Sequence, residues 1–477
     1  MTQTRRAGVL MPVSSFEGTL GIGDFGSSAY TWIQNLAKTN ATIWQILPLN
    51  PVGYGNSPYQ TYSSFAGDEI YISIEKLYAT LQLEFDQEPV FGKRVNFGAV
   101  RTLKTAYLRN AFQHFKKDAS YDAFLEVAVT WLDEYVTFIA LKKLNDNASW
   151  TEWKVMKVSE SELEYERFVQ YVFYMQWMDL KKYANDLGIR VVGDIPIYLG
   201  HDSAEVYHHR DQFLLNRDGT PAWVAGVPPD YFSTEGQLWG NPIYDWKAMA
   251  HNDYALWADR LRWNQEMFDV IRIDHFRAFD TYWIIPGESE TARIGEWKIG
   301  PRNHFFDAMY RQIENLELVV EDLGDLRPEV LELRDDYDLM GMKIIQFNLN
   351  PHELEANALV DSNILVYTGT HDNQTMADWT DELTIKKYKE ITKNLKDLGH
   401  DYPSLWQQVA SYTLSLNANW AILPIQDLMG LDNEARINEP GTIGSPNWEW
   451  KLDLNTDLTD AFQFLATLVT AFDRVVD

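Results

Sequence analysis

Short apolar runs, many of them β-branched, recur along the chain, and each is followed by polar or glycine-rich residues. Runs of this length are typical of buried strands, although short apolar runs also occur in buried helices, so the strand count carries an error of about one or two. Helical patterns separate most of the runs, as in parallel βα units, and eight strands close a barrel. We therefore predict an α/β fold, a (β/α)8 TIM barrel with strands near residues 8–13, 43–49, 189–195, 270–274, 318–321, 343–347, 364–370 and 420–423.

The segment between the second and third runs is much longer than a barrel needs. Residues 98 to 187 are dense in helix formers and aromatic residues, and Gly188 stands where a helix C-cap is expected. We predict a mainly helical subdomain, residues 68–187, inserted after the second strand. Residues 1–67 and 188–477 then form the catalytic barrel.

The segment between the third and fourth runs also exceeds a simple connection. Residues 224–246, VAGVPPDYFSTEGQLWGNPIYDW, combine glycine, proline and aromatic residues. A loop of this length in a compact domain is usually a lid or a binding loop, and the alternative is an ordinary hydrophobic loop packed on the barrel. We predict a long βα loop that covers the active site and presents the rings of Tyr231, Phe232 and Trp239.

Composition narrows the class of protein. The chain has 41 basic and 69 acidic residues, a net charge of −28, which opposes binding to nucleic acid or anionic lipid. It has no cysteine, which excludes disulfides, thiolate nucleophiles and cysteine-ligated zinc. No apolar run is long enough for a signal peptide or a membrane span, so we expect a soluble cytoplasmic protein.

Aromatic residues make up 14% of the chain, which is an unusually large share, and many stand in polar segments rich in glycine and proline. Most large rings belong to cores. Rings in loops also suit stacking on the C–H faces of sugars, and a neutral polyol needs no positively charged surface.

Three acidic residues follow predicted strands: Asp274 the fourth, Glu321 the fifth and Asp372 the seventh. In a barrel these strand ends meet on one face, where active sites lie. Cleavage of a glycosidic bond needs one carboxylate nucleophile and one carboxylic acid. Any one of these residues alone is more often a helix cap or an ion-pair partner. Arg272, on the same strand face as Asp274, and His371 favour the catalytic interpretation of the set.

Seven segments carry a more specific resemblance. The chain resembles the 4-α-glucanotransferases of the amylomaltase (disproportionating enzyme) family, glycoside hydrolase family 77, within the α-amylase superfamily. The motifs span almost the whole chain: SPYQTYSSFAGD (57–68), GDIPIYLGHDSAEVY (193–207), the 224–246 segment, VIRIDHFRAF (270–279), VVEDLG (319–324), VYTGTHDNQT (366–375) and EARINEPGT (434–442).

The resemblance implies roles for the three carboxylates. Asp274 corresponds to the nucleophile that forms a glucosyl-enzyme, Glu321 to the general acid and then base, and Asp372 to the transition-state stabiliser. The substrate-binding residues implied or expected are Arg272, His371, Tyr59, Ser57, Asp194, Gln237, Trp239, Asn241 and Tyr54. For Tyr54 a simple packing role is at least as good an interpretation. His208 and His209 lack ligand spacing, and we expect no metal and no cofactor.

The function implied is transfer of a 1,4-α-glucan segment to the 4-hydroxyl of an acceptor, by a retaining double displacement. The expected partners are maltooligosaccharides and 1,4-α-glucans, with glucose as an acceptor. The alternatives are a maltodextrin hydrolase or a 1,6-branching enzyme on the same fold. A further alternative, of a different class, is a non-catalytic glucan-binding protein, which complete retention of the carboxylates disfavours.

Overall fold

The computed structural model describes residues 4–86, 92–229, 234–357 and 362–476. Eight parallel strands form one sheet in the order β10-β11-β12-β1-β2-β3-β6-β9, and a parallel bridge between Val319 and Met340 joins the two ends into a barrel. The strands are β1 (Arg6–Leu10), β2 (Ile43–Gln45), β3 (Arg190–Ile195), β6 (Val270–Ile273), β9 (Leu318–Val320), β10 (Gly341–Ile344), β11 (Ile364–Tyr367) and β12 (Trp420–Pro424). The predicted (β/α)8 barrel is confirmed.

The barrel strands overlap all eight predicted ranges, with different ends. Strand β10 begins before the predicted residue 343 and ends at Ile344, where a 3-10 turn (Ile345–Phe347) follows. Side chains from every barrel strand fill the interior, as expected for a packed barrel. This inner cluster consists of Leu10, Ile43, Val192, Val270, Val319, Met342, Leu365, Tyr367, Trp420 and Ile422.

Helices fill the long connection between β2 and β3. They are α2 (Ile74–Leu81), α3 (Phe97–His114), α4 (Ala119–Val127), α5 (Leu132–Leu144) and α6 (Glu160–Asp186). The side chains of Ser73, Asn96 and Ser159 cap the starts of α2, α3 and α6. After α6, Gly188 adopts φ 78°, the left-handed conformation expected at a C-cap. The helical content agrees with the prediction, whereas the 68–187 boundary of a separate subdomain stays a prediction.

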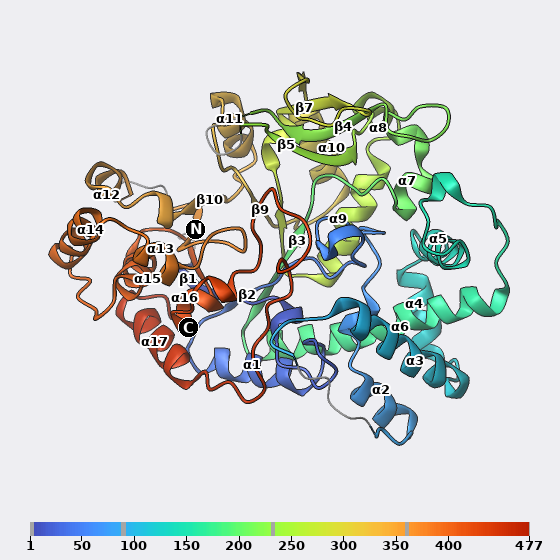
Figure 1. Cartoon of the computed structure of the whole chain (residues 1–477), viewed down its shortest axis with the longest axis horizontal. Helices are drawn as coiled ribbons and strands as arrows, with labels where there is room; N and C mark the ends of the chain where they lie inside the picture. The colour runs from blue at the N-terminus through green and yellow to red at the C-terminus, as the bar shows by residue number, and fades with distance from the viewer. Residues whose placement is uncertain (1–3, 87–91, 230–233, 358–361, 477) are drawn as a thin grey trace.

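A second sheet lies beside the barrel (Figure 1). It is antiparallel, in the order β5-β4-β7-β8, with β4 (Trp223–Val227), β5 (Gln237–Pro242), β7 (Thr281–Pro286) and β8 (Glu296–Ile299). Residues 224–227 and 237–242 of the predicted 224–246 loop are therefore strands, although the whole segment still belongs to the long connection between β3 and β6. Strand β4 contains glycine and β5 contains glycine and proline. Strand β4 is stabilised by pairing with the distant β7, and β5 by pairing with β4, so local sequence gives a weak signal. Tyr231 and Phe232 lie outside the described residues.

The remaining helices follow the barrel strands. They are α1 (Ser27–Ala37), α7 (Ala204–His208), α8 (Trp246–His251), α9 (Ala255–Met267), α10 (Arg302–Gln312), α11 (Pro328–Asp336), α12 (Pro351–Asn357), α13 (Met376–Asp381), α14 (Ile385–Asp397), α15 (Leu405–Ser415), α16 (Ile425–Met429) and α17 (Thr459–Ala471). Within the described part of the chain, no helix is long and apolar enough to cross a membrane.

Candidate active site

Arg272 is the centre of the charged network at the barrel mouth. It lies on β6 with its side chain buried, and its Nη2 atom lies 3.1 Å from Oδ1 of Asp274, which follows the strand. Its Nη1 atom lies 2.6 Å from both carboxylate oxygens of Asp194 at the end of β3. Burial opposes the charged guanidinium, but the carboxylates of Asp194 and Asp274 raise the pKa of Arg272 well above its ordinary value. Arg272 is thus a permanent cation beside Asp274.

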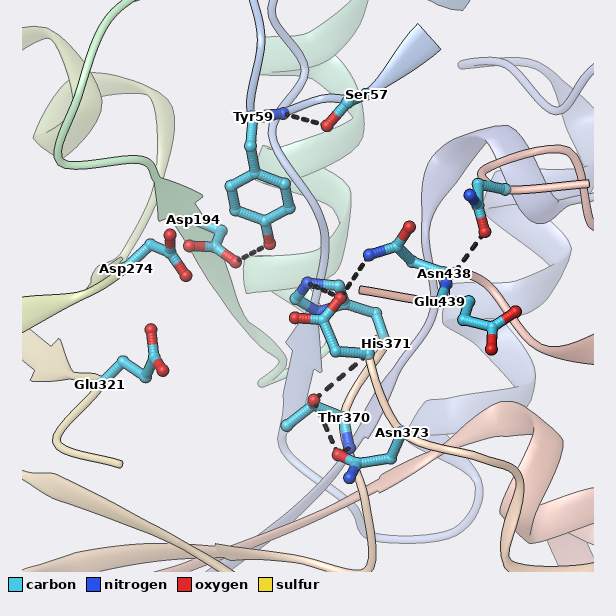
Figure 2. Close-up of polar contacts among 12 residues, drawn as sticks. Ser57, Tyr59, Asp194, Asp274, Glu321, Thr370, His371, Asn373, Asn438 and Glu439 are labelled. Carbon is cyan, nitrogen blue, oxygen red and sulfur yellow. Dashed lines mark hydrogen bonds and ion pairs between the residues drawn. The ribbon is translucent and has the colours of Figure 1, made fainter. Parts of the chain in front are cut away.

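Glu321 lies directly after β9, next to Asp274 (Figure 2). Its Oε2 atom accepts a 2.7 Å hydrogen bond from the backbone N–H of His275 and lies 3.5 Å from Nη2 of Arg272. Burial raises the pKa of Glu321 well above its usual range, and the charge of Asp274 adds to this, while Arg272 opposes it. The environment therefore favours a protonated Glu321 beside an arginine-paired Asp274.

His275 provides the backbone N–H because of an unusual conformation. Its φ of 55° and ψ of 48° lie in the left-handed region, which is uncommon for a residue with a side chain. Burial, with a contribution from Arg277, lowers the pKa of His275 to about 3, so the imidazole is neutral. The prediction from sequence did not include His275 as a functional residue, because the backbone turn has no side-chain signature.

The loop after β11 holds the third carboxylate. His371 is buried, and its Nε2 atom lies 3.5 Å from Oδ1 of Asp372, whose side chain is 46% exposed. Asn438 donates to the same oxygen at 2.7 Å, and Arg436 donates to the backbone oxygen of Asp372 at 2.8 Å. Thr370 accepts from the backbone N–H of Asp372 (Figure 2). Asp372 is therefore open to a ligand but fixed in place.

Tyr59 joins this loop to Asp194. Its hydroxyl donates to Oδ2 of Asp194 at 2.7 Å, and its ring stacks on His371 with centroids 5.3 Å apart (Figure 2). Trp448 packs against both rings, 5.9 Å from each. Ser57 accepts from the backbone N–H of Tyr59 at 3.3 Å. Tyr54 belongs to a 3-10 turn (Tyr54–Asn56), and its side chain lies outside the described part of the structure.

Strand β5 provides the polar groups of the opposite wall. The indole N–H of Trp239 donates to Gln237 Oε1 at 3.1 Å, and its ring meets His275 edge-on at 4.8 Å. Gln60 donates to Asn241 Oδ1 at 2.9 Å and to the backbone oxygen of Trp239 at 3.1 Å. The second sheet is therefore tied to the loop after β2 across the site.

These groups line one groove with a volume of about 1940 Å³, well above the roughly 300–1,000 Å³ of pockets for small ligands. The groove contains ten of the predicted residues: Asp274, Glu321, Asp372, Arg272, His371, Tyr59, Ser57, Gln237, Trp239 and Asn241. Asp194 does not line it, because this carboxylate lies behind Arg272 and Tyr59. Burial raises the pKa of Asp194 even though Arg272 opposes the shift.

The prediction also left out Trp448, Arg436 and Asn438, which line the same groove. The last two stand in the 434–442 motif, so the resemblance contained a signal for them. No cluster of three or more histidine or acidic side chains suited to a metal occurs among the residues that the structure describes.

Comparisons with known proteins identify the family of the chain. The family model described as 4-alpha-glucanotransferase, glycoside hydrolase family 77, matches residues 11–456. The 4-alpha-glucanotransferase of Clostridium butyricum is 39% identical, with 97% of this chain and 100% of that protein covered. That of Streptococcus pneumoniae serotype 4 is 38% identical, with 99% and 98% covered.

A solved structure agrees over the same length. The amylomaltase from Streptococcus agalactiae in complex with acarbose superposes with a TM-score of 0.91 at 32% identity, covering 99% of this chain and 100% of that one. The chain therefore belongs to the 4-alpha-glucanotransferase family, glycoside hydrolase family 77.

Proposed function

We propose that this 4-alpha-glucanotransferase works by a retaining double displacement, with Asp274 as nucleophile and Glu321 as general acid and base. One observation carries the proposal: a single nitrogen of Arg272 lies 3.1 Å from Asp274 and 3.5 Å from Glu321. The shared contact holds the two carboxyl groups close together, as retaining glycosidases require. The raised pKa of Glu321 matches the need for a proton donor.

The proposed reaction has two displacement steps. The carboxylate of Asp274 attacks the anomeric carbon, while Glu321 gives its proton to the departing glycosidic oxygen, which leaves with the reducing-end fragment. The 4-hydroxyl of the acceptor then attacks the glucosyl ester. The ionised Glu321 takes the hydroxyl proton, and Asp274 departs as a carboxylate. Two inversions retain the α configuration.

Asp372, His371 and Tyr59 are proposed to hold the reacting sugar. Asp372 is exposed to the groove and fixed by Asn438, so its carboxylate can accept hydrogen bonds from ring hydroxyls. Such bonds strengthen as positive charge develops in the transition state. His371 keeps its orientation because it stacks on Tyr59.

We propose maltooligosaccharides and 1,4-α-glucans as donors, and glucose or maltodextrin as acceptors. The large groove fits a chain of sugars, and Trp239, Gln237 and Asn241 provide one ring and two amides to hold it. An ordered acceptor competes with water for the intermediate because its hydroxyl is already positioned. The cytoplasmic location expected from composition and from the lack of an apolar run of signal-peptide or membrane-span length stays a prediction.

Incubation with maltotriose tests this function against the hydrolase alternative. Transfer predicts glucose plus a ladder of longer maltooligosaccharides with no net gain in reducing ends. A steady rise in reducing ends contradicts it.

A variant pair tests the role of Glu321. Glu321→Gln is expected to lower transfer by about 10²–10⁴-fold, the usual contribution of a general acid and base. Glu317→Gln is the matched control. Glu317 lies directly before β9, the strand that Glu321 follows, and it pairs with Arg190 at the start of β3. Near-normal activity of Glu321→Gln would reject the assignment.

A further inference from the structure

Trp297 is a large ring exposed at the edge of the second sheet. It lies on β8, whose residues are all exposed, and its side chain is 42% accessible. Its neighbour Trp283, directly opposite on β7, packs into a small core with Val224, Ile285 and Ala292. Trp297 therefore continues the covered apolar face of Trp283 as an exposed ring.

Two neighbouring side chains fix the position of the Trp297 ring. The guanidinium of Arg277 lies 4.5 Å from the ring centroid, and Trp283 meets the ring at 5.4 Å and 63°. Arg277 also donates to the backbone oxygen of Asp325 at 3.1 Å. Arg277 and Asp325 belong to the loops that follow Asp274 and Glu321, so the ring is tied to both catalytic loops.

Trp297 lines the same groove as the carboxylates. The groove also includes Arg277, Thr281 and Leu238 of β5, whose side chain is 41% exposed. A groove of about 1940 Å³ exceeds the size of a single small-ligand pocket, so it extends beyond the reacting sugar. The wall of the groove thus includes the partly exposed aromatic ring of Trp297.

We propose that Trp297 forms a distal sugar subsite, in which the indole stacks on a glucose unit of a long α-glucan and Leu238 extends the apolar surface. The proposal rests on the glucan substrates proposed above. A neutral sugar suits this wall, because its C–H face covers an apolar ring and its hydroxyls stay free for water. Short substrates that occupy only the centre of the groove do not reach the ring.

The test compares kcat/KM for maltotriose and maltoheptaose. Trp297→Ala is expected to lower the value for maltoheptaose about tenfold, the effect of losing roughly 50 Å² of apolar contact, and to leave maltotriose within about twofold. Trp297→Phe keeps a ring and is expected to retain most activity on maltoheptaose. Ile299→Ala is the matched control, since Ile299 lies on the same strand and is 62% exposed but does not line the groove.

Each other outcome overturns the proposal. Equal losses on both substrates mean that Trp297 supports the catalytic centre, and no loss on either means that the ring binds no sugar. A change in sedimentation with unchanged kinetics means that the ring contacts another protein. If the wild type itself fails to disproportionate maltotriose, the proposed function fails; if only the dependence on chain length is missing, the subsite alone fails.

Discussion

At the scale of single residues, three carboxyl groups around one arginine have different properties because their surroundings differ. Asp194 is buried and accepts from Arg272 and Tyr59, so it orders the site. Asp274 shares Arg272 but faces the groove. Glu321 lies farther from Arg272, and burial, together with the charge of the neighbouring Asp274, raises its pKa. The sequence places these residues at strand ends but contains no information on how Arg272 divides its contacts.

The raised pKa of Glu321 predicts that this carboxyl group stabilises the fold less as the pH rises. A carboxyl group whose pKa is higher in the folded state stabilises the fold fully below its unfolded pKa and loses this contribution as the pH rises through the folded pKa. Glu321→Gln cannot titrate, so its thermal midpoint relative to the wild type should increase between about pH 5 and pH 8. Paired thermal melts across this range measure the difference. A constant or falling difference would show that the site does not raise this pKa.

At the scale of elements, the barrel strands were predictable and the second sheet was not. The barrel strands are continuous apolar runs because both of their faces are buried. Strand β4 is stabilised by pairing with β7, from beyond β6, and β5 pairs with β4. The sequence of β5 is QLWGNP, in which Gly240 has φ 78°. The functional residues divide in the same way. Those at strand ends could be predicted from the sequence, whereas Trp448 joins the site only through tertiary packing.

We predict that helix α16 stabilises the loop that holds His371 and Asp372. Its buried Asp427 accepts from Thr368 at 2.5 Å and from the backbone N–H of Met376 at 2.7 Å, so it holds both ends of that loop. Asp427→Ala is expected to lower both the thermal midpoint and transfer, the latter about tenfold, because a buried N–H loses its partner. Asp427→Asn keeps an acceptor and should retain most activity.

Steady-state transfer on maltotriose and thermal melts check this prediction. Asp397→Ala provides the control, since Asp397 is exposed at the end of α14. Equal behaviour of Asp427→Ala and the control would show that the loop does not depend on Asp427.

At the scale of the whole molecule, the two ends of the chain meet where β1 pairs with β12 (Figure 1). Arg474, after the last helix, is buried and donates to the backbone oxygens of Arg6, Leu414, Leu416 and Ala418. Arg474, near the C-terminus, thus stabilises the junction between β1 and β12, which we call the seam of the barrel. This contact joins residues too far apart in sequence for any local pattern to indicate it.

Arg474→Ala is therefore expected to destabilise the protein by roughly 2–4 kcal/mol, because several charge-assisted hydrogen bonds are lost together. Transfer activity at 25 °C should stay near the wild-type value, since the seam is remote from the groove. Denaturant melts measure the loss. Arg311→Ala, which removes an exposed ion pair with Asp253, should change stability little; an equal effect of the two variants would refute the role of the seam.

The most direct test of the proposed double displacement is whether a sugar becomes covalently attached to Asp274. The protein is incubated with 5-fluoro-α-D-glucosyl fluoride, a substrate whose glucosyl-enzyme breaks down slowly, then digested and analysed by mass spectrometry. If Asp274 is the nucleophile, the peptide that contains Asp274 carries a fluoroglucosyl adduct, and the Asp274→Asn variant has no such adduct. An adduct on another carboxylate, or normal transfer by Asp274→Asn, would contradict it.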